Sequence, residues 1–172
     1  AVKTPGSNIF PYIKKNLDDI ITVEDDELIV AFLDMVENHK MIVENSGLLT
    51  VAALKHLGVK DKRVVSILSG GNMDVITMSS VVQQGLIFRD RIFTVSVLLP
   101  DKPGELAKVA QTLADVQGNV IKLEHNQFVT TNRSAAVELR ITLECFGTEH
   151  KEQIIAALEK KGYKPRIVRT MI

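Results

Sequence analysis

Several features are scarce or missing in this 172-residue chain, and each absence excludes a class of protein. The single cysteine, Cys145, excludes an internal disulfide. No apolar run approaches the ~20 residues that a helix needs to cross a bilayer, and the opening Ala-Val-Lys-Thr-Pro-Gly is not a secretory signal. We therefore expect a cytoplasmic protein with no membrane partner.

The chain also lacks a net charge, although its charges are unevenly spread. Residues 1–90 carry 9 basic and 12 acidic side chains, and residues 91–172 carry 12 and 9. Neither half has the dense basic stripe of a nucleic-acid-binding protein, so we expect no nucleic-acid partner. The histidines have no metal-ligand spacing, so we expect no metal site. These histidines are His39, His56, His125 and His150.

In the first half, strand-like and helix-like segments alternate. The β-branched run at 19–23 and the apolar run at 63–68 are typical of buried strands. Apolar residues at helical spacing predict helices at 24–36, 47–57 and 74–86. Together these segments predict the edge of a parallel sheet covered by helices. Such a sheet needs flanking strands to bury both faces, so we expect this half to belong to a larger domain.

The second half predicts a complete small domain. Its periodicity indicates the order βαββαβ, which is typical of a ferredoxin-like sandwich. The predicted strands are 93–99, 119–126, 137–145 and 164–169, the helices are 103–116 and 149–161, and a hairpin passes through Thr130, Thr131, Asn132 and Arg133. The boundary is expected near residues 85–90, which gives two units at 1–88 and 89–172.

A strand-to-helix junction in the first half carries the motif with the clearest chemistry. The apolar run 63–68 ends in Ser69-Gly70-Gly71-Asn72, directly before the predicted helix 74–86. Paired glycines allow a sharp turn, and free N–H groups at a helix start attract anions, so α/β folds bind phosphorylated ligands and cofactors at such junctions. The alternative interpretation is a simple turn with a capping serine.

In order and spacing, the motifs of this chain resemble the pyridoxal-phosphate-dependent threonine dehydratases that carry one C-terminal ACT regulatory domain. The resemblance covers essentially the whole chain and implies an α/β fold, in which a partial parallel-sheet segment of a fold-type II catalytic domain precedes a ferredoxin-like ACT domain. The residues that carry it are Ala-Val-Lys-Thr-Pro-Gly at 1–6, Asp18-Asp19, Glu44 with Gly47, Ser69-Gly70-Gly71-Asn72, Asp101-Lys102-Pro103-Gly104 and Gly118-Asn119-Val120.

The resemblance implies a cofactor-binding set in the first half. Ser69 would share a hydrogen bond with the pyridine nitrogen of pyridoxal 5'-phosphate, and Glu44 would lie near the phenolic edge of the cofactor. Gly70, Gly71 and Asn72 would shape the floor of the pocket. A hydroxyl does not favour a protonated ring as a carboxylate would, and a neutral ring suits elimination of a β-hydroxyl group. The alternative role for Glu44 is that of an acid complementing a helix dipole.

The same resemblance implies that this chain matches only the C-terminal part of the enzyme. The family's Schiff-base lysine, its phosphate-cradling glycines and its substrate loop lie in the N-terminal part, and nothing in this sequence matches them. We therefore expect no catalytic residue in this chain, no cofactor bound by the chain alone, and a catalytic N-terminal segment as its partner. The complete enzyme would convert threonine to 2-oxobutanoate and ammonia.

In the second half, the resemblance implies a site for a small amino-acid effector. Asp101 and Gly104 precede the predicted helix 103–116, and Asn119 and Val120 begin the next strand. Backbone N–H groups near Gly104 would hold a carboxylate, and Asp101 or Asn119 would hold an ammonium group. The ACT domain would also form a homo-oligomer, a dimer or tetramer. Two alternatives from another class are a stand-alone ACT ligand sensor and a dimerisation module.

Overall fold

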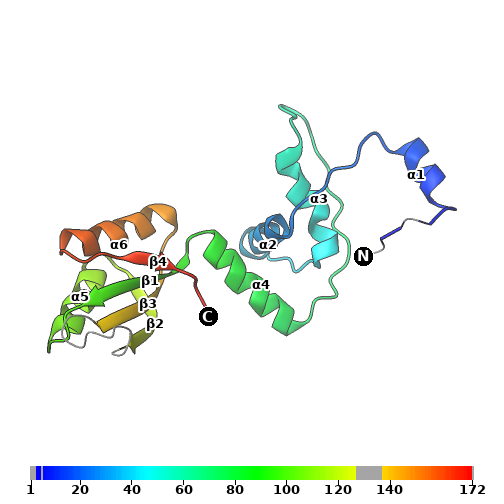
Figure 1. The fold of residues 1–172 in the computed structure, drawn as a ribbon. Helices are drawn as coiled ribbons and strands as arrows, with labels where there is room; N and C mark the ends of the chain where they lie inside the picture. Colours follow the sequence, from blue (N-terminus) through cyan, green and yellow to red (C-terminus); the bar gives the residue numbers. More distant parts are fainter. Residues whose placement is uncertain (1–2, 5, 127–136, 172) are drawn as a thin grey trace.

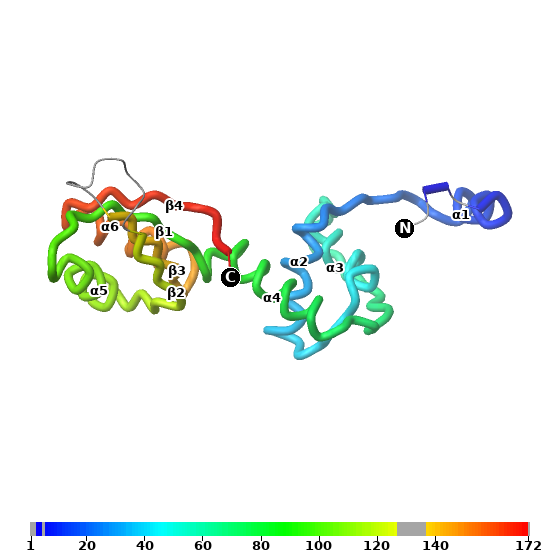
Figure 2. Tube along the Cα trace, turned by 60° about the horizontal axis from the view of Figure 1, so that its bottom comes forward, coloured from blue at the N-terminus to red at the C-terminus, as the bar shows by residue number. Residues whose placement is uncertain are grey.

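The structure is a computed structural model that describes residues 3–4, 6–126 and 137–171. Two regions lie at opposite ends of an elongated molecule, and helix α4, Val75–Phe88, connects them (Figure 1). The view in Figure 2 is turned by 60° and shows the same separation. The N-terminal region is helical, whereas the C-terminal region contains a four-stranded sheet.

Two helices begin the N-terminal region. Helix α1, Phe10–Asn16, has no buried residue. Helix α2, Asp25–Asp34, begins with a capping box in which Glu24 and Glu27 satisfy each other's backbone N–H groups. It continues into a π-helical turn, η1 (Met35–His39), and this confirms the helix predicted at 24–36.

The segment predicted as one helix at 47–57 is divided into three short helical pieces. They are the 3₁₀ turn η2 (Asn45–Leu48), helix α3 (Leu49–Ala52) and the 3₁₀ turn η3 (Ala53–His56). Helix α4 forms where the sequence predicted it, because the Asp74 side chain accepts hydrogen bonds from the first N–H groups of this helix.

The strands predicted at 19–23 and 63–68 do not form, and within the described residues the first half has no parallel sheet. The two segments are irregular, and their apolar side chains point largely into solvent, with Val65 88% and Ile67 73% exposed. Side chains rather than a strand ladder attach the second segment to α3, since the Thr50 hydroxyl donates to the carbonyl of Ile67 at 2.9 Å. The prediction was wrong because a β-branched run forms a strand only beside another strand that pairs its backbone.

Helices α2 and α4 pack together and enclose the core of the N-terminal region. Gly85 of α4 lies against α2, where a Cβ atom would be 3.2 Å from side-chain atoms of Leu33. This close approach brings the helices together over a small cluster. The buried members of the cluster are Leu28, Ala31, Phe32, Met35, Val43, Leu48, Ala52 and Val81.

The C-terminal region has the predicted βαββαβ order. Its elements are β1 (Ile92–Leu99), α5 (Glu105–Asp115), β2 (Asn119–Asn126), β3 (Val137–Glu144), α6 (Thr148–Lys160) and β4 (Arg166–Val168). The strands lie in the order β2-β3-β1-β4 and pair antiparallel, which confirms the ferredoxin-like sandwich. The hairpin predicted at 130–133 lies outside the described residues.

Helices α5 and α6 cover one face of this sheet and bury a continuous core between helices and strands (Figure 1). Alternate residues of β1 and β3 point into the core, as their period of two predicts. The members supplied by the helices are Val109, Leu113, Ile154 and Leu158, and those from the strands and their ends are Phe93, Val95, Val97, Leu99, Leu139, Ile141, Leu143 and Cys145.

Residues 89–91 connect α4 to β1, and the two outer side chains face the N-terminal region. The guanidinium of Arg89 lies 3.2 Å from Glu37 Oε2 and 3.4 Å from Asp34 Oδ1. Arg91 forms a second ion pair with Glu37. Two arginines of the connector are therefore attached to acids near the end of α2.

Asp90, between the two arginines, faces the C-terminal region. Its carboxylate accepts hydrogen bonds from Lys151 Nζ at 2.6 Å and from the Thr148 hydroxyl at 2.9 Å, both in α6. The hydrogen bond from Lys151 holds the pKa of Asp90 below its ordinary value. The backbone N–H of Cys145 also donates to the carbonyl of Arg91 at 2.8 Å. Consecutive connector residues are thus attached to different regions.

Candidate functional site

The residues predicted to bind a cofactor come together from two separate loops of the N-terminal region. The backbone N–H of Glu44 donates to the carbonyl of Gly70 at 3.3 Å. In return, the carboxylate of Glu44 accepts a hydrogen bond from the backbone N–H of Asn72 at 3.2 Å. The structure therefore joins Glu44 to the Ser69–Asn72 turn, although 25 or more residues separate them in the sequence.

Two glycines allow these loops to touch. A Cβ atom on Gly47 would lie 1.7 Å from the carbonyl oxygen of Ser69, so no other residue fits there without backbone movement. Gly70 has a φ of +78°, and a Cβ atom on it would lie 2.4 Å from Cδ of Glu44. The junction therefore requires glycine on each loop.

The outer side of this junction is open. Ser69, Gly71 and Asn72 are exposed, and no hydrogen bond of the Ser69 hydroxyl is found within the described ranges. Glu44 is half-buried, and its carboxylate accepts a hydrogen bond from the hydroxyl of Ser46. An exposed hydroxyl next to two glycines is compatible with a planar ring bound beside it, so the residues present fit the cofactor role. Ser46 was not among the predicted site residues, because only its contact with Glu44 identifies it.

The predicted effector residues fall into two separate groups. Asp101 and Gly104 lie in the exposed loop after β1, beside a cavity of about 290 Å³ that is lined by residues 99–106 and His125. His125 of β2 was predicted to be structural, and only the strand register places it at this loop.

Asn119 and Val120 lie at the other end of the sheet. Strand pairing aligns Asn119 with Glu144, and Glu144 with Ile92 at the start of β1. At about 3.4 Å per residue, the eight-residue strand β1 separates this position from the Asp101 loop by roughly 24 Å. Within one chain the two groups do not form one site. The amide of Asn119 instead donates to the carboxylate of Glu144 at 3.0 Å.

Residues 3–4, 6–126 and 137–171 contain no cluster of three or more histidine, cysteine, aspartate or glutamate side chains with metal-binding geometry. Within the same residues, no helix is both long and apolar enough to cross a membrane.

Comparison with known sequences gives matches along nearly the whole chain. Residues 93–162 match the ACT domain family. The chain is 37% identical to an L-threonine ammonia-lyase of Geobacter sulfurreducens over 165 residues, and 33% identical to an L-threonine ammonia-lyase of Thermotoga maritima over 169 residues. The similarity to threonine dehydratases that the motifs indicated is therefore confirmed.

The matches cover a large share of this chain and a much smaller share of each relative. They include 95% and 98% of this chain but only 41% and 42% of the two relatives. The chain thus spans about two fifths of the length of these curated relatives. Among solved structures, the ACT domain of prephenate dehydrogenase from Bacillus anthracis aligns with 42% of this chain and 99% of its own, at 23% identity and a TM-score of 0.34.

Proposed function

Because residues 93–162 belong to the ACT domain family and the chain as a whole is similar to threonine ammonia-lyases, we propose that it is the C-terminal part of such an enzyme. In this proposal, residues 1–88 supply one wall of the cofactor pocket, and residues 89–172 form the regulatory domain. The complete cytoplasmic enzyme deaminates threonine to 2-oxobutanoate. Its Schiff-base lysine lies in the N-terminal part of the enzyme, outside these 172 residues. The junction of Glu44 and Gly47 with Ser69–Asn72 carries the proposal.

The chemistry of this junction supports a role beside pyridoxal 5'-phosphate. When bound, that cofactor supplies an electron sink for loss of the substrate's α-proton and β-hydroxyl group. The Ser69 hydroxyl, for which the described residues show no partner, can donate or accept a hydrogen bond at a ring nitrogen. Glu44 is fixed by Asn72 and Ser46, so its charge stays at the pocket edge. Gly70 and Gly71 keep the floor flat because they have no side chain.

Exposed apolar residues support the need for further polypeptide. Ile20 in one irregular segment and Val65 and Ile67 in the other lie largely in solvent. Burying such side chains is worth about 1.5–3 kcal/mol each, so polypeptide that covers these segments would stabilise them strongly. We propose that further polypeptide of the complete catalytic domain covers these side chains.

The proposed effector site lies between two copies of the ACT domain. The Asp101 loop and the Asn119 end are on opposite ends of one sheet, so two antiparallel copies bring one of each together. Strand β2 is suited to such pairing because Val120, Ile121 and Leu123 are exposed along it. Gly104 and its loop then hold the carboxylate of a small amino acid, and Asn119 of the second copy lies near its ammonium group.

The cofactor role can be tested in a chimera. This chain replaces the matching 165 residues of the Geobacter sulfurreducens relative, and the chimera is compared with its Ser69→Ala and Ser79→Ala variants. We expect Ser69→Ala to change the cofactor absorbance and to lower threonine turnover at least tenfold. Ser79 is an exposed serine of α4 outside the junction, so its variant is the matched control. A folded, cofactor-loaded Ser69→Ala chimera with unchanged spectrum and turnover would contradict the role.

The 172-residue chain itself provides a second test. With added cofactor and threonine it should produce no 2-oxobutanoate, and production would refute the proposal that catalysis needs another segment. Calorimetry with amino acids tests the effector site, where Asp101→Ala and Asn119→Ala should each abolish the heat of binding. Loss of binding in only one variant would contradict a site shared between two copies.

A further inference from the structure

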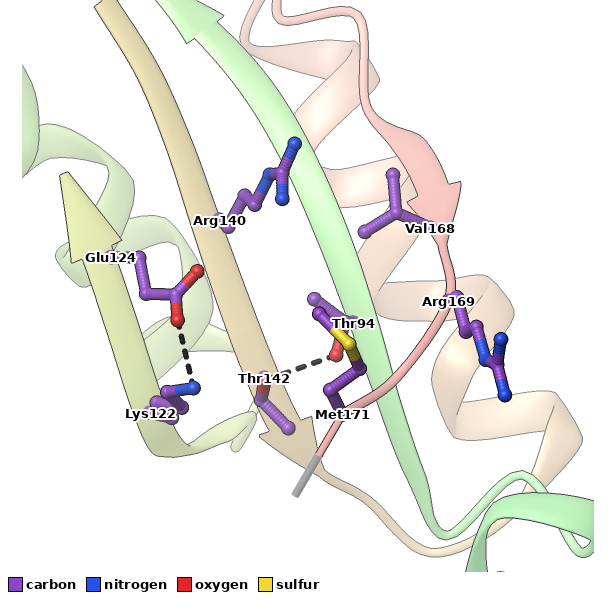
Figure 3. Close-up of a pocket in the computed structure, with 8 residues that line it drawn as sticks. All are labelled: Thr94, Lys122, Glu124, Arg140, Thr142, Val168, Arg169 and Met171. Carbon is purple, nitrogen blue, oxygen red and sulfur yellow. Dashed lines mark hydrogen bonds and ion pairs between the residues drawn. The ribbon is translucent and has the colours of Figure 1, made fainter. Parts of the chain in front are cut away.

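The sheet face opposite α5 and α6 contains an unusual buried polar patch. Polar side chains on the uncovered face of an antiparallel sheet normally point into water. Here Thr94 of β1 and Thr142 of β3 are only 6% and 4% exposed. Longer side chains and the segment after β4 rise around them and enclose a cavity of about 190 Å³ (Figure 3). The lining residues are Thr94, Lys122, Glu124, Arg140, Thr142, Val168, Arg169 and Met171.

Strand register places these residues in two rows across the sheet. The first row passes through all four strands, from Lys122 to Thr142, Thr94 and Val168. The second row pairs Glu124 with Arg140. The pocket is therefore built on the rigid pairing of the strands, in contrast to the loop that holds Asp101.

Within the described residues, Arg140 is held in place through one nitrogen atom. Its Nε donates to Glu138 Oε2 at 3.1 Å, and Glu138 is also held by the hydroxyl of Ser96 at 2.6 Å. The hydrogen bond from Ser96, with a smaller contribution from Arg140, lowers the pKa of Glu138 and keeps it charged. Among the described residues, no partner is found for the two terminal amino groups of Arg140. Their donors remain for a ligand with planar oxygen atoms.

The two threonines supply a further donor at the pocket floor. Their Oγ1 atoms are 2.9 Å apart, so one hydroxyl donates to the other. Such a pair uses one of its two hydroxyl hydrogens and leaves the second for a ligand. Lys122 and Glu124 form an ion pair at 2.7 Å and largely offset each other. Arg169 also lines the pocket, but its side chain points away from Arg140 in Figure 3, so the two guanidinium groups do not converge.

The remaining wall is apolar. Val168 on β4 faces Arg140 across β1, and Met171, from the segment after β4, is drawn beside Thr94 (Figure 3). The space has a volume of about 190 Å³. It therefore suits a compact molecule with one oxyanion and a short hydrocarbon part.

We propose that this open-face pocket binds a small aliphatic carboxylate. The carboxylate lies on the terminal amino groups of Arg140 and accepts the spare hydroxyl hydrogen of the threonine pair. The hydrocarbon part contacts Val168 and Met171. This site is separate from the effector site at Asp101 and Asn119, and it does not depend on catalysis.

The test uses the 172-residue chain with two probes that differ only in an α-ammonium group, 3-methylbutanoate and L-valine. Amide and methyl NMR shifts are expected at Thr94, Thr142 and Met171 on addition of the probe. Equal binding of both probes identifies a simple carboxylate, and preference for L-valine identifies an amino acid; either supports the site. Shifts confined to residues 101–105 would overturn this site and support the effector site instead. Shifts at the pocket that depend on protein concentration alone would overturn it in favour of a second copy.

Variants separate a specific site from general charge. Arg140→Lys keeps the charge but loses the planar fork, and we expect at least tenfold weaker binding. Thr94→Val keeps the shape but removes one hydroxyl, and we expect severalfold weaker binding. Arg166→Lys is the matched control, because Arg166 belongs to β4 but does not line the cavity. Unchanged affinity in folded Arg140→Lys and Thr94→Val chains would overturn the proposal.

Discussion

The two regions of this chain use similar residues with opposite results. Val65 and Val95 both lie in β-branched apolar runs, yet Val65 is 88% exposed and Val95 is completely buried. Val95 belongs to β1, which has a partner on each side, whereas the segment around Val65 has none among the described residues. The difference shows that a hydrophobic pattern makes a segment suitable for a strand. The segment forms a strand only when a neighbouring strand pairs with its backbone.

Separating the two regions should give the largest effect. Residues 89–172 have a closed core and paired strands, so we expect this piece to unfold cooperatively in urea. Residues 1–88 have a small core and many exposed apolar side chains, so we expect no sharp transition and a tendency to aggregate. Circular dichroism during urea titration measures both. A cooperative transition of similar steepness for residues 1–88 would remove the contrast between the regions.

A pair of leucines compares the two cores directly. Leu48 and Leu139 are both fully buried, one in each region. Leu139→Ala should cost about 2–5 kcal/mol of unfolding free energy, because its surroundings are fixed by strands on both sides. Leu48→Ala should cost less, since its smaller cluster can collapse into the space. Urea unfolding of the 172-residue chain gives both values, and a larger loss for Leu48→Ala would reverse the ranking.

A pair of glycines tests the contact between the two loops of the N-terminal region. Gly47→Ala introduces a Cβ atom against the carbonyl of Ser69, and forcing the backbone apart should cost about 1–3 kcal/mol. Gly58 has open space around the position of a Cβ atom, so Gly58→Ala should change stability by no more than about 0.5 kcal/mol. Amide shifts at residues 69–72 should move only in Gly47→Ala. Equal shifts in both variants would show that the loops are not in contact.

The smallest expected effect concerns Glu27, which links α2 to η3. Hydrogen bonds from Lys55, and next from His56, lower its pKa from 4.5 to about 2. A lowered acid pKa adds stability that is complete above 4.5 and is lost as the pH falls through about 2. Glu27→Gln should therefore lower the urea midpoint slightly at pH 7 and hardly at pH 2.

The control for that measurement is Glu152→Gln, which removes an exposed carboxyl of α6 for which the described residues show no ion pair. Its urea midpoint should follow that of the unsubstituted chain at both pH values. A difference between Glu27→Gln and the unsubstituted chain that stays constant with pH would exclude the charge of Glu27 as its cause.

Sequence alone was sufficient for the C-terminal region because all its partners lie within about 80 residues. The strand alternation through Val95 and Ile141 and the helix face of Val109 and Leu113 indicate the same core, and the structure contains it. In the N-terminal region the same reasoning failed at 19–23 and 63–68, since no pattern inside a segment says whether a neighbouring strand is present. The helix predicted at 74–86 from its own apolar spacing does form, as α4, and the structure shows that Asp74 caps it.

The candidate sites show the same limit. The spacing of Glu44 and Gly47 and the turn at Ser69 are visible in the sequence, but their contact depends on two loops meeting in space. The separation of Asp101 from Asn119 follows from the strand register, which cannot be predicted from the sequence pattern alone. The open-face pocket was not predicted, because its residues come from all four strands and the segment after them.

The connector at residues 89–91 has a mechanical consequence. Its side chains alternate between the two regions, so it contains no slack that could absorb a twist. We therefore expect that a displacement of the sheet relative to α2 would strain the ion pairs of Arg89 and Arg91 with Asp34 and Glu37.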